Sequence, residues 1–132
     1  MSGPEQTLAT IEHFNVLFNQ RNVDAVMELM TGDVVFENTS GGRFEGADNV
    51  RALLQRAFAL MTPGGFDTED IIVAQDRAVV LWTYQFNRAE PGQGHIRGVD
   101  VFRLREGKVA ERFWYVKSAE FVEKLGLTIP GT

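Results

Sequence analysis

Hydrophobic residues recur at helical spacing most clearly between residues 50 and 61. The apolar positions fall at i, i+3, i+4, i+7, i+8 and i+11, and they are Val50, Leu53, Leu54, Ala57, Phe58 and Met61. Asp48 precedes the run and is a residue type that caps helices, while Pro63-Gly64-Gly65 follows it. The pattern therefore predicts a helix that starts at Asp48, ends before Pro63 and packs one face against a core.

Two more helices are predicted nearer the N-terminus. The first follows Gly3-Pro4-Glu5 and runs to about residue 20, with apolar positions at Leu8, Ile11, Phe14, Leu17 and Phe18. The second begins after Asn22, a good cap, and stops at Gly32.

Shorter apolar runs between turn residues predict strands. A short strand is expected over 33–38, then a loop over 39–46, and then strands over 67–74, 78–87, 95–104 and 109–117. A tight turn at Glu106-Gly107 joins the last two strands. The strand at 78–87 is apolar on both faces, which is typical of a strand covered on both sides. A last short helix is expected over 118–125, closed by Gly126.

This order of elements predicts a two-layer α+β fold, in which helices pack on one face of a curved antiparallel sheet. The chain has 132 residues and shows no linker or repeat, so residues 1–132 are expected to form a single domain. One helix layer covers only one face of the sheet. We therefore expect a second copy of the chain on the other face, giving a homodimer through the sheets.

Asp100 stands in a strand face that is otherwise apolar. Because side chains alternate along a strand, Asp100 shares its face with Ile96, Gly98, Phe102 and Leu104. Desolvation there would raise the pKa of the carboxyl group and leave a neutral acid that can polarise a carbonyl group. Alternatively, a salt bridge to Arg112 would keep Asp100 ionised. The sequence leaves both arrangements open.

Composition narrows the classes of partner. The formal net charge is -5 and no run of Lys or Arg occurs, which argues against nucleic acid and anionic membranes as partners. The absence of cysteine excludes disulfides and thiol chemistry. His13 and His95 are the only histidines and no acidic cluster accompanies them, so neither a metal site nor a cofactor is expected. No segment resembles a signal peptide or a membrane span, and a cytoplasmic protein is expected.

Three segments resemble the nuclear transport factor 2-like superfamily, within its SnoaL-like and ketosteroid isomerase-like group. They are FNQRNVDAVMELMTGDVVFEN at 18–38, FEGADNVRALL at 44–54 and GVDVFRLREGKVAE at 98–111. The group also includes polyketide cyclases and limonene-epoxide hydrolases. The resemblance implies a cone-shaped sheet that encloses a cavity, and it implies several chemistries because this fold hosts more than one.

The resemblance also implies site residues. Asp100 falls where ketosteroid isomerases keep a protonated aspartic acid that donates to the substrate oxyanion. Asn38 stands at the position of their catalytic base, and Phe14 at that of their oxyanion tyrosine. The cyclases and epoxide hydrolases carry an aspartate on the last strand, where this chain has Trp114. The expected catalytic residues are therefore Asp100 and Asn38, and the expected substrate-binding residues are Phe14, Phe18, Leu54, Phe58, Phe102, Arg112 and Trp114.

These features favour a small-molecule protein. The first expectation is that an apolar cavity binds a steroid-, terpene- or polyketide-like carbonyl compound, and that Asp100 donates a hydrogen bond during isomerisation or cyclisation. One alternative is a binding domain without chemistry. Another is a dimeric association domain that uses Trp82, Tyr84 and Phe86 and has a filled cavity. A third is water addition to an epoxide, which requires acids that flank an arginine.

Overall fold

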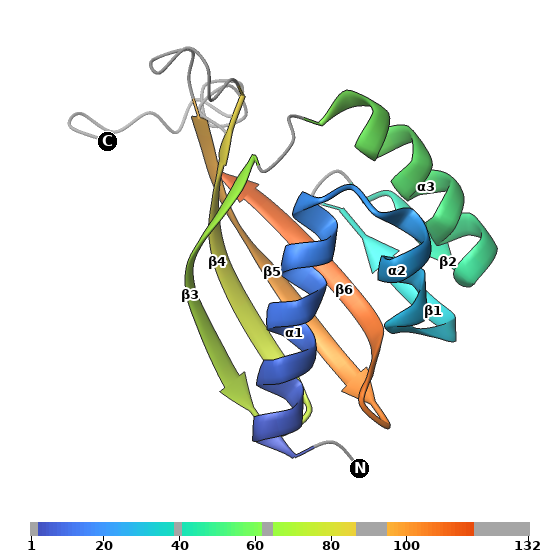
Figure 1. The fold of residues 1–132 in the computed structure, drawn as a ribbon, viewed down its shortest axis with the longest axis vertical. Coiled ribbons are helices and arrows are strands. Elements are labelled where there is room, and N and C mark those ends of the chain that lie inside the picture. The colour runs from blue at the N-terminus through green and yellow to red at the C-terminus, as the bar shows by residue number, and fades with distance from the viewer. Residues whose placement is uncertain (1–2, 39–40, 62–64, 87–94, 118–132) are drawn as a thin grey trace.

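The computed structural model describes residues 3–38, 41–61, 65–86 and 95–117. Two helices come first along the chain, followed by two strands, a third helix and four further strands (Figure 1). The helices are α1 (Pro4–Asn19), α2 (Val23–Glu28) and α3 (Ala47–Leu60), and the strands are β1 (Met30–Glu37), β2 (Arg43–Glu45), β3 (Phe66–Ala74), β4 (Arg77–Gln85), β5 (His95–Arg105) and β6 (Lys108–Lys117). The helix predicted over 118–125 and most of the Pro63-Gly64-Gly65 stop lie outside the described residues.

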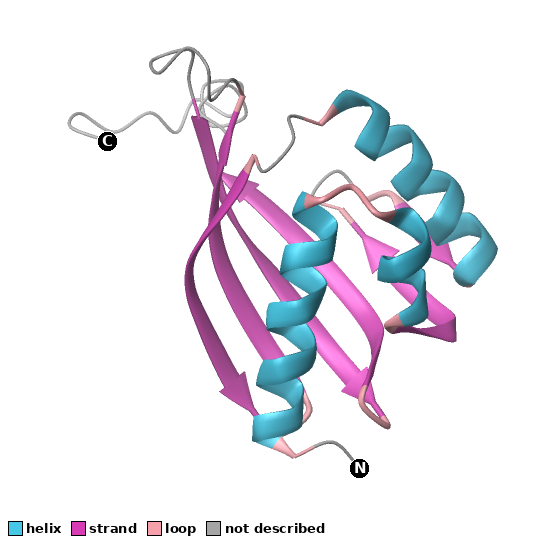
Figure 2. Ribbon diagram, viewed as in Figure 1, coloured by secondary structure: helices cyan, strands magenta, loops and turns pink. Residues whose placement is uncertain are grey.

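The strands form one curved six-stranded sheet in the order β2-β1-β6-β5-β4-β3. Neighbouring strands pair antiparallel except β1 and β6, which pair parallel, so the sheet is mixed and mostly antiparallel. The helices lie on one face of it, with α1 along the long strands and α3 near β1 and β2 (Figure 2). This arrangement confirms the predicted α+β class and places the helix layer over the face that carries Asp100.

The predicted apolar helix faces are the buried ones. Val50, Leu54 and Phe58 of α3 are buried, as are Ile11, Phe14 and Phe18 of α1. Asn22 caps α2 through its side-chain oxygen, which accepts a hydrogen bond from the Ala25 N–H at 3.1 Å. Asp48 does not cap α3, because Gly46 occupies the cap position and Asp48 lies in the first turn.

Two boundary predictions near residue 30 were wrong. The second helix ends at Glu28, and Gly32 lies inside β1 rather than at a helix end. The cause is strand pairing, since the Val109 N–H donates to the Leu29 carbonyl at 2.8 Å and Met30 pairs with Val109 of β6. The predicted loop at 39–46 likewise contains β2, whose residues pair with β1.

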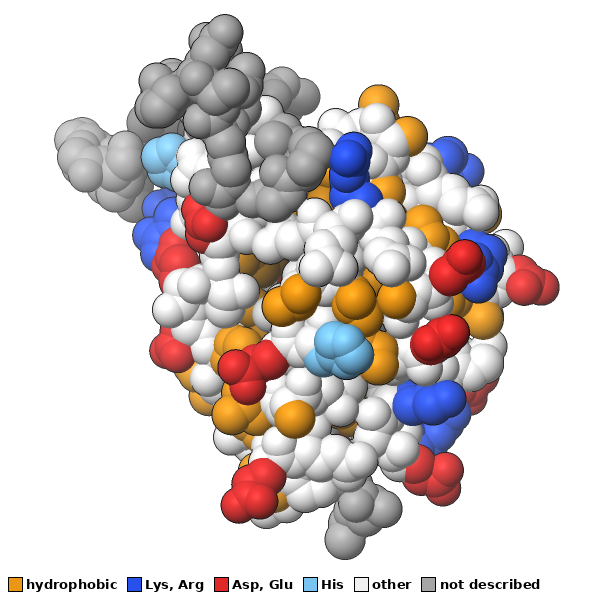
Figure 3. All heavy atoms as spheres, viewed as in Figure 1, with side chains coloured by type: hydrophobic (Ala, Val, Ile, Leu, Met, Phe, Trp, Pro, Cys, Tyr) orange, Lys and Arg blue, Asp and Glu red, His pale blue; other side chains and the backbone are white. Residues whose placement is uncertain are grey.

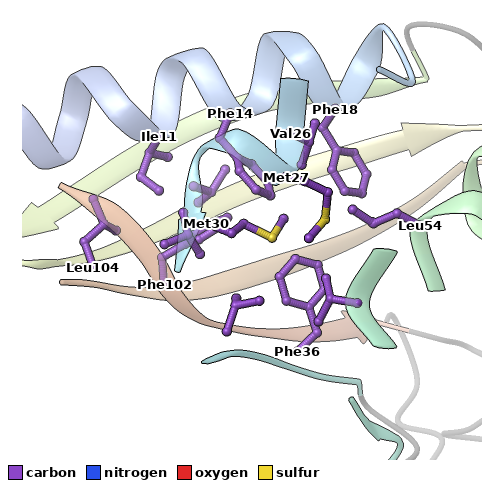
Figure 4. Close-up of a cluster of buried hydrophobic side chains, with 14 of the residues drawn as sticks. Ile11, Phe14, Phe18, Val26, Met27, Met30, Phe36, Leu54, Phe102 and Leu104 are labelled. Carbon is purple, nitrogen blue, oxygen red and sulfur yellow. The ribbon is translucent and has the colours of Figure 1, made fainter. Parts of the chain in front are cut away.

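The core lies between the helix layer and the inner face of the sheet (Figure 4). Phe14 and Phe18 project from α1 toward Phe36 of β1 and toward Met27 and Leu54. Phe102 is fully buried beneath them and packs edge-on against Phe14, with ring centroids 5.2 Å apart. Aromatic rings in this geometry stabilise a core beyond the area they bury.

Strand β4, which corresponds to the strand predicted over 78–87, is covered on one face within a single chain. Ala78, Val80 and Trp82 of β4 are buried under the helices, while Val79 and Leu81 on the outer face are only half-buried. The prediction that both faces are covered therefore depends on a partner.

Candidate functional site

Asp100 and Arg112 form a buried ion pair beneath α1. Cross-strand pairing places Phe102 opposite Arg112 and Asp100 opposite Trp114, so the two charged side chains meet diagonally on the inner face of β5 and β6. Arg112 Nε and Nη2 both donate to Asp100 Oδ2, at 3.2 and 3.1 Å. Each residue is only 5% exposed. Of the two arrangements that the sequence left open, the structure contains the salt bridge.

The carboxyl group of Asp100 is strongly desolvated. Burial raises its pKa above the usual carboxyl range, and the Arg112 guanidinium and the Trp82 indole N–H oppose that rise. Asp100 Oδ1 and Trp82 Nε1 each lack a partner within hydrogen-bond geometry in the described part of the chain. The Trp82 dipole therefore acts on the carboxylate from beyond hydrogen-bond geometry, and Arg112 is the main counter-charge.

Three aromatic rings surround the guanidinium. Arg112 Cζ lies 4.8 Å from the ring centroid of Phe18, 5.1 Å from that of Phe36 and 4.9 Å from that of Trp114. Contacts of this kind hold a cation in place through the negative face of each ring, and they are stronger where water is excluded. The guanidinium is thus fixed in position by rings from α1, β1 and β6.

A cavity of about 330 Å³ lies on one side of this pair, between α3 and the inner face of β4, β5 and β6. Its walls are almost entirely apolar. Among the described residues that line it, Arg112 is the only charged one, and these residues are Phe18, Leu53, Leu54, Ala57, Leu60, Met61, Phe66, Trp82, Tyr84, Phe86, Ile96, Arg112, Trp114 and Val116. A pocket of this size with one charged group at its wall is typical of sites for small organic molecules.

A second, much smaller cavity lies between α1 and strands β3 and β4. Its volume is about 20 Å³, enough for a single water molecule, and Asp100, Asn15, Asn19 and Thr68 are polar residues in its lining. Phe18, Phe66, Trp82 and Arg112 line both cavities, so they stand between them. Asp100 lines the small cavity and does not line the large one.

The family follows from a match over most of the chain. The family model of the SnoaL-like domain matches residues 11–112. The chain belongs to the SnoaL-like domain family. No curated protein matches its sequence.

Solved structures place this SnoaL-like domain in the nuclear transport factor 2-like fold. An NTF2-like protein of unknown function from Mesorhizobium loti is 31% identical, with a TM-score of 0.72 over 87% of this chain and 93% of that one. A protein with a ketosteroid isomerase-like fold from Catenulispora acidiphila, in complex with trimethylamine, is 14% identical, with a TM-score of 0.71 over 90% and 93% of the two chains. A de novo designed protein with a curved β-sheet is 17% identical, with a TM-score of 0.73 over 96% and 95%. The last two show the fold alone.

The structure brings together several of the predicted site residues of this SnoaL-like domain. Phe18, Leu54, Arg112 and Trp114 line the large cavity, whereas Phe14 and Asp100 line the small one. Phe58 supports the site by packing edge-on against Phe18, with centroids 4.8 Å apart, and the fully buried Phe102 belongs to the core.

Asn38 lies apart from these residues. Its side-chain oxygen accepts a hydrogen bond from the Gly42 N–H at 2.8 Å, and its backbone N–H donates to the Gly42 carbonyl at 2.9 Å. It lines neither cavity. In this SnoaL-like domain the residue at the isomerase base position thus holds the turn between β1 and β2, and the structure does not bring it to Asp100.

Sequence reasoning missed several residues of the large cavity. Phe66, Tyr84, Val116 and Met61 line it but were not predicted as site residues. Strand alternation could have found Val116, because it shares a face of β6 with Arg112 and Trp114. Trp82, Tyr84 and Phe86 line this cavity as well, and its volume of about 330 Å³ differs from the filled cavity that the association alternative predicts.

Other kinds of site find little support in the described residues. Within these ranges no group of three or more His, Asp or Glu side chains could hold a metal ion. Lys and Arg side chains are scattered among acidic ones on the face in Figure 3, without a basic stripe. None of the helices in the described part of the chain has the length and apolarity needed to cross a bilayer.

Proposed function

We propose that this domain binds one small apolar carbonyl compound, of steroid-, terpene- or polyketide-like character, in the cavity of about 330 Å³. The observation that carries the proposal is that the described residues place a single charged group, Arg112, in an otherwise apolar wall. The apolar walls supply binding free energy through burial, and the guanidinium N–H groups orient the polar end of the ligand. A relative with the same fold was solved with a small ligand, trimethylamine, which supports a ligand-binding role.

The geometry favours binding over isomerisation. Asp100 is held by Arg112 and does not line the large cavity, and Asn38 is engaged in a turn. A hydrogen-bond donor to a ligand in this cavity would therefore be Arg112 rather than a neutral Asp100. Water addition to an epoxide is also disfavoured, because Arg112 pairs with one acid instead of two in the described residues.

Filling the cavity should weaken ligand binding strongly. Ala57 lines the cavity from α3, so an Ala57→Phe ring would occupy ligand space. We expect its affinity for 2-acetonaphthone, an apolar ketone used as the probe, to fall by about a hundredfold, which corresponds to about 2.8 kcal/mol. Isothermal titration calorimetry measures the change. Ala59→Phe is the matched control, since Ala59 is exposed on the same helix and does not line the cavity. Equal affinity of the two variants for the ketone would mean that the ketone binds outside this cavity.

We also propose that the domain is a homodimer through the outer face of the sheet. Two apolar rows cross this face: Val79, Val101 and Phe113 are in register, and so are Leu81, Val99 and Tyr115. Tyr115 is 50% exposed in the single chain. The ion pairs Arg97–Glu69 and Arg103–Glu111 flank the rows. A surface with apolar rows between charges of both signs can complement itself under two-fold symmetry.

Val101→Lys should separate the dimer, because it puts a charge at the centre of the first apolar row. Sedimentation equilibrium is expected to give twice the chain mass of 14.8 kDa for the unmodified protein and the single-chain mass for the variant. Val16→Lys is the control, since Val16 is 53% exposed on α1, across the sheet from the proposed interface. A single-chain mass for the unmodified protein would contradict the proposal.

A further inference from the structure

Arg112 presents two edges to hydrogen-bond acceptors, and Asp100 occupies one of them. Nε and Nη2 both donate to the single oxygen Oδ2 of Asp100. The pair is therefore not the two-by-two fork that arginine forms with a carboxylate in its strongest geometry. The other edge of the guanidinium is made by Nη1 and Nη2. No described residue accepts a hydrogen bond from Nη1.

The position of the pair directs this second edge toward the large cavity. Arg112 lines the large cavity while Asp100 lines only the small one, so the guanidinium stands between the carboxylate and the large cavity. Aromatic rings pack around the guanidinium at 4.8 to 5.1 Å. A planar acceptor that approaches the guanidinium edge-on fits the space that the rings leave. A carboxylate is such an acceptor, because a guanidinium edge binds it through two parallel hydrogen bonds.

The charge balance of the site then requires uptake of a proton when a carboxylate binds. Asp100 and Arg112 neutralise each other, so a ligand carboxylate would add a second negative charge to one buried cation. Two carboxylates that share a buried site cannot both remain ionised. The other residues that line the small cavity beside Asp100 carry no ionisable group: Phe14, Asn15, Phe18 and Asn19 from α1, Phe66 and Thr68 from β3, and Val80 and Trp82 from β4. Arg112 of β6 is the only charge that faces Asp100 in the described residues.

We infer that the large cavity selects apolar compounds that end in one carboxylate, bound end-on by the Nη1–Nη2 edge of Arg112, with uptake of one proton from water at Asp100. This inference deepens the proposed function and rests on it, because it names the ligand class and adds a proton to the binding step. The ligand displaces no group from Arg112, and the proton removes the excess negative charge.

Two features make Asp100 the group that takes the proton. Burial already raises its pKa in the absence of ligand, so protonation needs less additional free energy than at an ordinary carboxyl group. The small cavity also leads from Asp100 to polar residues nearer the surface, since Asn15 and Asn19 are half-buried and Thr68 is exposed. A proton would approach the carboxylate from this side without passing the ligand.

Two probes of nearly equal shape test the inference: 2-naphthoate, which is anionic, and 2-acetonaphthone, which is neutral. Calorimetry in two buffers of different ionisation enthalpy should show uptake of about one proton per bound naphthoate and none for the ketone. Over the pH range in which a full proton is taken up, naphthoate affinity should fall about tenfold for each unit of pH increase. Ketone affinity should not change with pH.

Asp100→Asn provides the matched variant, because asparagine keeps an acceptor for Arg112 and removes the charge and the proton site. Naphthoate should bind this variant without proton uptake, at an affinity that no longer depends on pH. Binding of the ketone alone, or of naphthoate without proton uptake by the unmodified protein, would overturn the inference and leave the proposed function standing. If neither probe binds the unmodified protein, the proposed function fails as well. The buffer comparison on the unmodified protein decides the matter even if the variant does not fold.

Discussion

Arg112→Met should lower the free energy of unfolding by about 3–5 kcal/mol at neutral pH. Methionine is apolar and has a side chain of comparable length to arginine. The substitution leaves Asp100 buried at 5% exposure without the guanidinium that neutralises it. Removing one partner of a buried pair is costly because the remaining charge has lost both water and its counter-charge. Urea denaturation followed by circular dichroism measures the change through the shift in midpoint.

The loss in Arg112→Met should depend on pH. Burial raises the pKa of Asp100 in the folded state, and loss of Arg112 removes the main influence that lowers it. The folded state therefore binds more protons than the unfolded chain between the unfolded and the folded pKa of Asp100, so the stability of the variant should rise as pH falls through that interval.

The double variant Asp100→Leu, Arg112→Met serves as the control. With both charges replaced by apolar side chains, most of the stability should return, because buried pairs contribute little net stability over apolar residues of similar volume. Its stability should show no dependence on the titration of this site. A double variant as unstable as Arg112→Met would mean that Arg112 acts through its packing against Phe18, Phe36 and Trp114 rather than through its charge.

Local sequence patterns were sufficient to predict the elements whose formation depends on residues close together in the sequence. The apolar stripe of α3 follows from helical periodicity, and the turn between β5 and β6 contains Gly107 at φ 78°, a conformation that glycine adopts freely. The start of β1 was missed because it forms through pairing of Met30 with Val109, which are distant in the sequence. Gly32 resembles a helix stop when only its sequence neighbours are considered, but pairing with β6, which is distant in the sequence, places it inside a strand.

The candidate site was predictable only in part for a similar reason. Alternation along β5 identified Asp100 as an acid on an apolar face, and the same rule put Arg112 and Trp114 on one face of β6. Whether acid and arginine meet depends on the cross-strand register, in which Phe102, not Asp100, lies opposite Arg112. The two cavities depend on how far α1 and α3 stand from the sheet, and no residue pattern encodes that distance. Asn38 was assigned by resemblance alone, and its role in the turn required the position of Gly42.

Phe18→Ala should cost about 3–5 kcal/mol of unfolding free energy, the usual range for removing a buried phenylalanine ring. Phe18 is 8% exposed, and its ring packs against Phe58 at 4.8 Å and against the Arg112 guanidinium at the same distance. The loss combines apolar burial, ring contacts and support for the buried cation. Thermal and urea unfolding measure it, and Val16→Ala on the exposed side of α1 should change stability by no more than about 0.5 kcal/mol.

The same variant should alter the site as well as the stability. Phe18 lines both cavities, so its removal should join them and expose Asp100 to whatever occupies the large one. We expect Phe18→Ala to bind ligands larger than 2-acetonaphthone and to bind 2-acetonaphthone itself more weakly, because the enlarged cavity contacts the ketone less closely. Phe18→Leu, which retains most of the volume, should keep the original preference. Unchanged selectivity in Phe18→Ala, together with the expected loss of stability, would show that the ring supports the core without separating the two cavities.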